Sequence, residues 1–262
     1  MSNMTTKEYI TKAFSNGKAF IPFITCGDPS LEITEQLVYT MEKEGADLIE
    51  LGIPFSDPVA EGVVIQRASE RALANGTTTD AIFEMVRRIR SNSKVPLAFM
   101  TYANLLFTYG LERFLCQCKE LGICCVILPD IPYEEKNEML PKFNEYDIKL
   151  ISLITPASKQ RIAMIASEAE GFLYCVSSMG VTGTRTTITA DVSGMVEEAR
   201  RVTKTPCVIG FGISNPETAK EMAAVADGVI VGSAIVKLVE EHGTASLKPV
   251  GEFVRSMKKA IS

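Results

Sequence analysis

The chain has 262 residues, 46% of them hydrophobic and 23% charged, so it can bury a large core and is not a disordered chain. A formal net charge of −5, with no long Lys/Arg run, argues against nucleic acid or an acidic membrane surface as a partner. Because no long apolar segment and no signal-peptide pattern is present, we expect a cytoplasmic protein that does not cross a membrane.

Short apolar runs alternate along the chain with longer amphipathic stretches, which is the pattern of a parallel sheet covered by helices. Eight such runs are predicted to be strands: 20–25, 47–51, 96–101, 124–128, 149–154, 171–176, 206–210 and 228–231. The count of eight favours a closed barrel over an open doubly wound sheet. With no Pro/Gly/Ser linker to divide the chain, we expect residues 1–262 to form a single α/β domain, a (βα)8 TIM barrel with an extra N-terminal helix.

The stretches between the predicted strands carry helix start signals. Asp28-Pro29-Ser30 precedes a segment with apolar residues four apart on one face, and Asn215-Pro216 opens another helix. Further helices are predicted over residues 5–14, 79–90, 111–121, 134–144, 159–169, 192–202, 234–241 and 247–261. Each gap between strands is therefore long enough for a crossover helix.

The second predicted strand ends in a carboxylate with apolar neighbours. Alternation puts Glu50 on the same face as Leu48 and on the opposite face from Ile49 and Leu51. Apolar surroundings disfavour the ionised carboxyl and raise its pKa toward the range useful for proton transfer at neutral pH. If this face points into the barrel, Glu50 lies at the active-site mouth; a strand-end glutamate that reaches water is the alternative.

A second acid, Glu61, lies in the irregular stretch 53–64 that follows this strand. Pro54 and Pro58 stiffen the stretch, because each proline fixes its own φ and restricts the residue before it. Spacing alone leaves Glu61 as a solvated loop residue, but a stiff loop can also hold a carboxylate in place. The other long irregular stretch, 180–189, likewise follows a strand, on the side where barrels carry catalytic and lid loops.

Glycine-bearing turns follow the last three predicted strands, at residues 180–183, 210–214 and 232–234. Small residues let backbone N–H groups approach a phosphate closely, and Ser233 lies where a helix N-terminus would direct free amides at an anion. Any barrel needs tight turns, so one such turn would indicate little. Three of them in the loops that commonly hold phosphate predict a phosphorylated ligand.

Cysteine and histidine usage gives no sign of a metal site. The seven cysteines lie mostly in apolar runs without paired C-x-x-C spacing, and we interpret them as buried reduced thiols. The single histidine, His242, lies in a polar stretch and is expected at the surface. We expect no metal.

The string Glu50-Leu51-Gly52-Ile53-Pro54-Phe55-Ser56-Asp57-Pro58, followed by Gln66, resembles the signature of the tryptophan synthase α subunit family. Residues 20–29, 102–104, 129–132, 180–183 and 210–213 resemble other segments of the same family, so the likeness covers nearly the whole chain. In combination these motifs are highly specific.

The resemblance implies cleavage of indole-3-glycerol phosphate to indole and glyceraldehyde 3-phosphate, without metal or organic cofactor. This retro-aldol reaction needs protonation of indole C3, removal of a hydroxyl proton, and stabilisation of positive charge at the indole N–H. Glu50 matches the family's acid–base residue, Glu61 its second catalytic acid and Tyr174 a tyrosine of its site, although a strand tyrosine alone is more often core.

The resemblance also implies binding roles for further residues. Phosphate-binding positions are matched by Gly183, Gly212, Gly232 and Ser233. The apolar indole pocket would be lined by Phe23, Met100, Leu128, Ile154 and Phe211, each of which would otherwise be read as barrel core. Thr182, on the sixth loop, would close over the substrate and hold the acid of the second loop in place.

One position departs from the family pattern. The family's second loop usually reads Ala-Asp-Gly-Pro, whereas this chain has Ala60-Glu61-Gly62-Val63. The extra methylene moves the carboxylate by roughly 1.5 Å, a misplacement that can lower the rate on the order of 100-fold. The loss of proline gives the loop freedom to reseat the longer side chain, and we expect this compensation to occur.

The resemblance implies a partner, a pyridoxal-phosphate-dependent β subunit in an α2β2 heterotetramer, contacted by Asp57 and Pro58 of the second loop and Asn104 of the third. Rival interpretations remain open at this point. They are an isomerase or synthase of a neighbouring phosphate-binding barrel family, an allosteric activator of the β subunit with little lyase activity, and a stand-alone indole producer.

Overall fold

The computed structural model describes residues 4–156, 158–176, 185–210 and 212–262. Its strands pair only in parallel, in the order β5-β4-β3-β2-β1-β9-β8-β7-β6. They are β1 (Ala19–Thr25), β2 (Ile49–Gly52), β3 (Leu97–Met100), β4 (Ile123–Ile127), β5 (Lys149–Leu150), β6 (Ser152–Ile154), β7 (Leu173–Val176), β8 (Cys207–Gly210) and β9 (Gly228–Val231).

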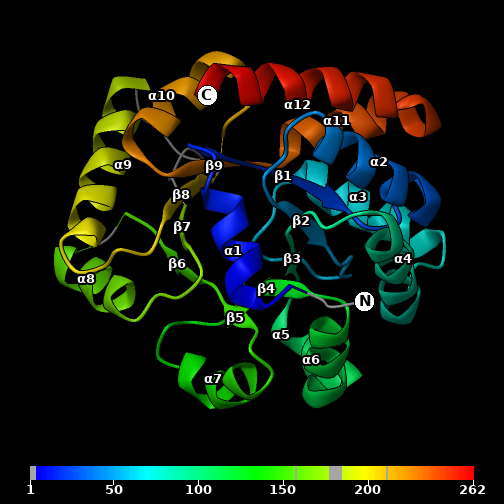
Figure 1. Ribbon diagram of the computed structural model, residues 1–262, viewed down its shortest axis with the longest axis horizontal. Helices are drawn as coiled ribbons and strands as arrows, with labels where there is room; N and C mark the ends of the chain where they lie inside the picture. The colour runs from blue at the N-terminus through cyan, green and yellow to red at the C-terminus, as the bar shows by residue number, and fades with distance from the viewer. Residues whose placement is uncertain (1–3, 157, 177–184, 211) are drawn as a thin grey trace.

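The two ends of this sheet meet within one stretch of chain. Only Ile151 separates β5, which pairs with β4, from β6, which pairs with β7. The two segments are thus one strand of the sequence, and the ring of eight strands closes through it, as the predicted TIM barrel requires (Figure 1).

Apolar side chains fill both sides of the strands. Ile21, Leu48, Ala98 and Val208 belong to a buried cluster inside the barrel. A larger cluster, which includes Ile49 and Leu51, lies between the strands and the surrounding helices. A parallel sheet buried on both faces reads as continuous apolar runs, which explains why the strands were visible in the sequence.

The helices surround the ring of strands (Figure 1). They are α1 (Thr6–Phe14), α2 (Leu31–Lys43), α3 (Val63–Ala74), α4 (Thr79–Asn92), α5 (Ala103–Tyr109), α6 (Leu111–Glu120), α7 (Lys136–Glu145), α8 (Lys159–Ser167), α9 (Arg185–Arg200), α10 (Pro216–Val225), α11 (Ser233–His242) and α12 (Leu247–Ile261), with a short 3-10 turn at Gly243–Ala245. Within the described parts of the chain, no helix combines the length and the apolar character needed to cross a membrane.

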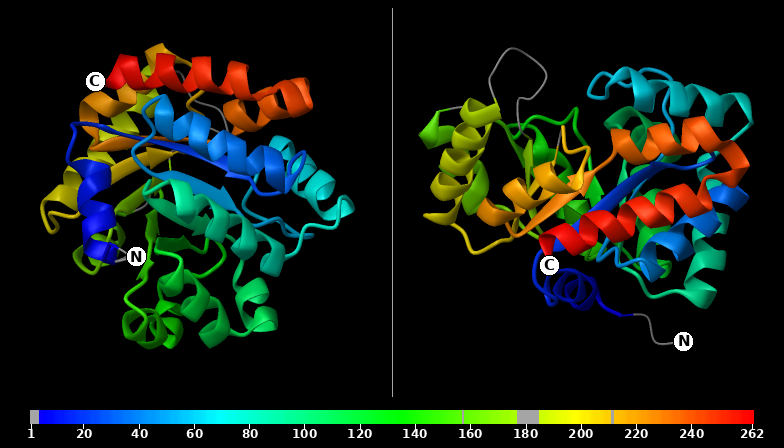
Figure 2. Two further views of the ribbon diagram at one scale, coloured as in Figure 1. Left: turned by 45° about the vertical axis from the view of Figure 1, so that its right-hand side comes forward. Right: turned by 90° about the horizontal axis from the view of Figure 1, so that it is seen from above.

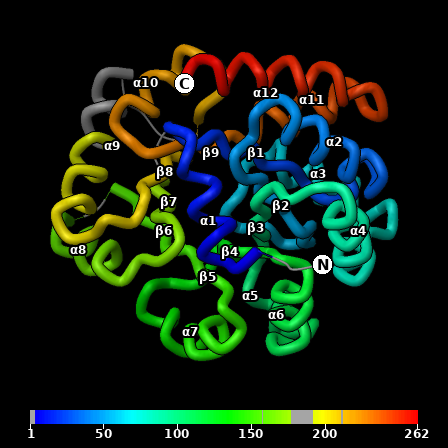
Figure 3. Tube along the Cα trace, in the orientation of Figure 1, coloured from blue at the N-terminus to red at the C-terminus, as the bar shows by residue number. Residues whose placement is uncertain are grey.

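The first helix closes the amino-terminal end of the barrel. Thr5 caps it through a reciprocal hydrogen-bonded pair with Glu8. Tyr9 packs so closely on Gly122, just before β4, that a Cβ there would lie 2.9 Å from the ring. Figures 1 and 3 show α1 across the ring of strands, and in the right-hand view of Figure 2 it lies at the opposite end from α3.

Two helices and the start of α9 show the largest differences from the sequence predictions. α3 and α5 have no predicted counterpart. The buried residues of α3 are Ala68, Ser69 and Ala72, which form no strong apolar stripe, and the seven residues of α5 are too few for a helical period to show. α9 begins at Arg185 instead of residue 192, since its Thr-rich first turns resemble a loop in composition.

Candidate active site

A cavity of about 430 Å³ opens at the carboxyl-terminal ends of the strands. Eight of the predicted site residues line it: Phe23, Glu50, Glu61, Met100, Tyr174, Gly212, Gly232 and Ser233. They come from β1, β2, β3, β7 and the turns after β2, β8 and β9, so distant parts of the sequence meet at one end of the barrel. This is the end at which TIM-barrel active sites are built.

Glu50 is the buried acid of this cavity. Its strand register sets it beside Phe23 of β1 and Ala98 of β3, and its side chain is 1% exposed. Within the described residues, neither carboxylate oxygen has a hydrogen-bond partner. Burial, and after it the charge of the nearby Glu61 carboxylate, raises the pKa of Glu50 to about 8. A carboxyl with such a pKa can give and take a proton at neutral pH.

Glu61 is half-buried, in the loop between β2 and α3. Burial raises the pKa of Glu61, while a hydrogen bond with Tyr102 opposes the rise. The Tyr102 hydroxyl also accepts a hydrogen bond from the Ala60 N–H at 3.1 Å, and its ring stacks on Phe55 with centroids 5.0 Å apart. The side chain of Gln66 donates to the Glu61 carbonyl at 2.8 Å. The third loop thus holds the second loop, and Glu61 with it, against the barrel.

Tyr102 was named in the third-loop motif but not predicted as a site residue. Its signal in the sequence is weak, because an aromatic residue after a strand is common in any core. Its backbone neighbour Ala103 donates to both oxygens of Asp130, at 3.2 and 3.1 Å, and so ties the third loop to the fourth. Ile65 and Ile213, which also line the cavity, likewise carry no signal beyond their apolar character.

Tyr174 points into the cavity from β7, and a glycine makes room for it. A Cβ on Gly210 of the neighbouring β8 would lie 2.5 Å from the Tyr174 ring and hydroxyl. Burial, and after it the charge of Glu50, raises the pKa of the Tyr174 hydroxyl well above its ordinary range. The phenol therefore stays protonated and available as a hydrogen-bond donor.

The turns after β8 and β9 offer backbone groups to an anion in this cavity. Gly232 precedes α11 and Ser233 is its first residue, so the free amides of that helix start face the cavity. Gly212 has a φ of 72°, which favours glycine over other residues. Gly183 and Thr182 lie outside the described residues, as does Phe211.

Two residues expected in the indole pocket lie on the other side of the barrel wall. Leu128 and Ile154 belong to the cluster between strands and helices and line a different cavity. Their neighbours Ile127 and Leu153 contact the interior cluster instead. The assignment was wrong by one residue on each strand, because a strand that is apolar on both faces has no alternation to show which side points inward.

The predicted partner-contact residues lie at the surface beside the cavity. Asp57 and Asn104 are exposed and Pro58 is partly exposed. Large apolar side chains are exposed on the same loops and helices, with Val59 82% and Phe107 61% accessible. Apolar side chains that are exposed together in one patch mark an interaction surface, whereas single ones do not.

Among the described residues, no cluster of three or more His, Cys, Asp or Glu side chains is arranged to hold a metal ion. The cavity instead combines two acids with raised pKa, an apolar wall formed by Phe23 and Met100, and a helix start suited to an anion. These groups suit acid–base chemistry on a substrate with an apolar part and a phosphate.

Comparison with known proteins agrees with this geometry. The family profile described as "Tryptophan synthase alpha chain" matches residues 10–262. The tryptophan synthase alpha chain of Alkaliphilus metalliredigens is 45% identical over 259 residues, covering 98% of this chain and 97% of that protein. The chain from Lactiplantibacillus plantarum is 46% identical over 255 residues and covers 96% of each protein.

Solved structures give the same result. Tryptophan synthase subunit alpha from Legionella pneumophila superimposes with a TM-score of 0.88 at 37% identity, over 98% of both chains. A structure of the tryptophan synthase a2b2 complex from Pyrococcus furiosus matches with a TM-score of 0.84 at 33% identity, over 92% of this chain and 98% of that one.

Proposed function

Because the chain belongs to the tryptophan synthase alpha chain family, we propose that it is the lyase that cleaves indole-3-glycerol phosphate to indole and glyceraldehyde 3-phosphate, with Glu50 as its acid–base group. The observation that carries the proposal is the buried, unpartnered Glu50 carboxyl in the same cavity as the α11 start. The isomerase and activator interpretations are not favoured, since relatives of nearly equal length are alpha chains.

Glu50 would act twice. With its pKa near 8 it is mostly protonated at neutral pH and can donate that proton to indole C3. The carboxylate left behind then takes the proton of the side-chain hydroxyl as the carbon–carbon bond breaks. Because the proton given up is recovered, Glu50 ends the cycle in its starting state.

Glu61 would accept a hydrogen bond from the indole N–H as positive charge develops on the ring. The hydrogen bond from Tyr102 favours the ionised form of Glu61, which this role requires. Compensation for the longer glutamate is supported by the contacts of the loop, which is held by Tyr102 and Gln66.

The substrate's orientation would follow from the cavity's two ends. We propose that the phosphate binds the amides at Gly212, Gly232 and Ser233, with Gly183 contributing from the sixth loop. The indole ring would pack against Phe23, Met100 and Tyr174, with Phe211 beside them and Thr182 closing the site. This orientation directs the bond to be cleaved toward Glu50.

We also propose that the exposed edge with Asp57, Pro58 and Asn104 contacts a β subunit in an α2β2 assembly. The exposed apolar side chains Val59 and Phe107 support this, as does the a2b2 complex of the Pyrococcus furiosus relative. We infer a cytoplasmic location. It is supported by seven free cysteines, since oxidising compartments favour disulfides.

The test is indole release from indole-3-glycerol phosphate, measured with and without a β subunit. Glu50→Gln should lower kcat by about 10²- to 10⁴-fold, the usual contribution of a general acid–base group. Glu70→Gln, an exposed glutamate on α3, is the matched control and should retain wild-type turnover. Wild-type turnover by Glu50→Gln, or no indole from the wild type even with a β subunit, would overturn the proposal.

A further inference from the structure

A second cavity lies between the barrel wall and helices α7 and α8. Its volume is about 190 Å³, and among the described lining residues it has none in common with the Glu50 cavity. Leucine and isoleucine form much of its wall: Leu128, Ile131, Ile151, Ile154, Ile162 and Ile165. The exposed residues Pro132, Thr155 and Arg161 also border it, so it has access to solvent.

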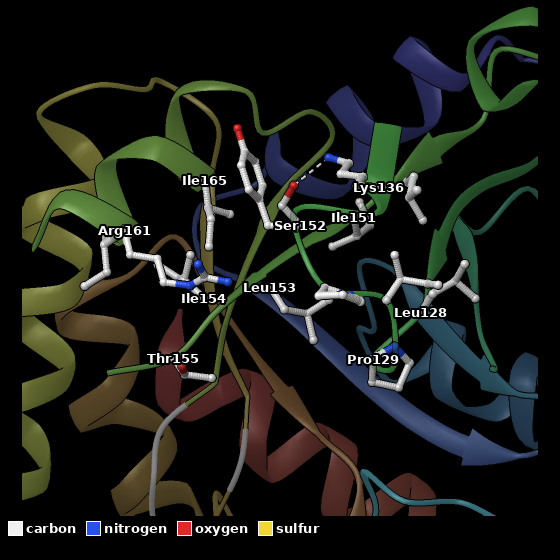
Figure 4. A pocket seen from close by; sticks show the side chains of 15 residues that line it. Leu128, Pro129, Lys136, Ile151, Ser152, Leu153, Ile154, Thr155, Arg161 and Ile165 are labelled. Atoms are coloured by element: carbon white, nitrogen blue, oxygen red, sulfur yellow. Dashed lines mark hydrogen bonds between the residues drawn. The ribbon is translucent and has the colours of Figure 1, made fainter. Parts of the chain in front are cut away.

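A buried lysine lines this cavity. The Lys136 side chain is 7% exposed, and its Nζ donates to the Ser152 hydroxyl at 2.7 Å (Figure 4). An ammonium carries three N–H donors, yet in the described chain Ser152 is its only hydrogen-bond partner and no carboxylate forms an ion pair with it. Arg161, on the other side of the view in Figure 4, is already paired with Glu134 at 2.6 Å.

A contribution to fold stability does not explain why a lysine is buried at position 136. Burial lowers the pKa of Lys136, and the carboxylates of Glu170 and Glu168 oppose this only from a distance. The residue is also the first of α7, where the helix dipole disfavours a positive charge. A methionine would fill the same space without the desolvation penalty of an incompletely paired cation. A group that weakens the fold in this way is typical of a binding site.

We propose that this cavity binds a small organic carboxylate, held at its anionic end by Lys136 and Ser152. The Ser152 oxygen accepts from Lys136, which leaves the hydroxyl hydrogen free to donate to a carboxylate. An apolar cavity of about 150 Å³ accommodates benzene. The larger volume here therefore suits a ring of that size plus a carboxylate, with the ring against Leu128, Ile154 and Ile165. Arg161 is already paired with Glu134, so Lys136 is the one cation among the described lining residues without an ion pair, and the site suits a single carboxylate better than an inorganic polyanion.

The proposal is tested by titrating benzoate and its neutral analogue benzamide into the full chain, by calorimetry or ligand-observed NMR. We expect saturable benzoate binding, with benzamide about tenfold or more weaker, because a hydrogen bond to a charged group contributes at least that factor. Lys136→Met should abolish the preference for benzoate. Lys142→Met, an exposed lysine of the same helix that pairs with Glu112 and Glu145, should preserve it.

The proposal would be overturned if benzoate did not bind saturably, or if Lys136→Met kept the wild-type preference for benzoate. It would also be overturned if glycerol 3-phosphate displaced benzoate, since that would assign benzoate to the Glu50 cavity. Ser152→Ala provides an independent variant if Lys136→Met folds poorly. It retains the cation and should weaken benzoate about threefold to tenfold without changing benzamide, since it removes one hydrogen bond. An unchanged benzoate affinity in Ser152→Ala would also contradict the assignment.

Discussion

The two ends of the barrel differ in whether their buried ionisable side chains have hydrogen-bond partners. At the amino-terminal end, the Arg90 guanidinium donates to the carbonyls of Leu121, Val95 and Gly122 at 2.8, 2.7 and 3.0 Å, and lies over the Tyr9 ring. At the carboxyl-terminal end, the Glu50 carboxylate has no partner in the described chain.

A second charge at the amino-terminal end follows the same rule as Arg90. Lys258 donates to Asp47 at 2.7 Å and to the Lys18 carbonyl at 2.9 Å, while Asp47 accepts the Phe20 N–H at 2.7 Å. A buried charge that is fully paired can stabilise the fold. A buried ionisable group without a partner, such as the Glu50 carboxyl, has a shifted pKa and can take part in proton transfer. The contrast assigns stability to one end and chemistry to the other, as in barrels generally.

The largest effect is expected at the amino-terminal end. Arg90→Met removes the cation and leaves three backbone carbonyls without this donor, each costing about 1 kcal/mol or more, so the free energy of unfolding should fall by about 3 kcal/mol or more. The kcat of the remaining folded enzyme should not change. Urea unfolding and indole release measure the two quantities. If Arg90→Met lowers kcat with little effect on stability, the division between the ends is wrong.

A smaller change in stability should follow pH at the other end. The folded-state pKa of Glu50 is raised to about 8 from an unfolded value near 4.5, so the native state holds this proton more tightly and loses stability as pH rises between the two values. From pH 6 to pH 8 the loss attributable to Glu50 is about 2 kcal/mol. The Glu50→Gln variant should not show this loss of stability between pH 6 and pH 8. Urea unfolding of the wild type and the variant at both pH values measures the difference. Parallel pH profiles would mean that Glu50 does not titrate in this window.

Tyr102→Phe should lower kcat about tenfold, because Glu61 loses its hydrogen bond and the Ala60 N–H loses its acceptor while the ring stack on Phe55 remains. The readout is kcat and KM for indole release. A tenfold rise in KM with unchanged kcat would argue that Tyr102 serves substrate binding and not the positioning of the acid.

The smallest effect is expected for Glu61→Asp, which restores the family's residue. If the loop has adapted to the longer side chain, turnover should stay within about tenfold of the wild type, because shortening the side chain moves the carboxylate away from a loop built for glutamate. The measurement is again indole release at saturating substrate. A gain of about 100-fold would show that the loop has not adapted.

The architecture and the main acid could be predicted from the sequence because each has a local signal. The sequence predicts one strand over residues 149–154, and the structure has two strand segments there, separated by Ile151. Glu50 faces inward on the same side as Leu48, as alternation predicts. Helix α3 could not be predicted, because its buried residues are Ala68, Ser69 and Ala72, which form no strong apolar stripe.

The lining of the site was less accessible to prediction. Leu128 and Ile154 sit one residue away from the inward-facing Ile127 and Leu153, and both members of each pair are apolar. Tyr102 acts through contacts with a loop that is distant in the sequence, so no local pattern identifies it. Contacts between loops that are distant in the sequence therefore could not be predicted from it.

The break at Ile151 has a consequence for association between molecules. The segments on either side of it complete the pairing of β4 and β7, so both of these strands are paired on both sides and the chain itself joins the two ends of the sheet. Exposed edges of apolar strands are templates for aggregation, and these strands are apolar on both faces. Ile151, 3% exposed and packed in the interior cluster, covers the point where the chain passes from β5 to β6, so the seam offers no site for a foreign strand to pair.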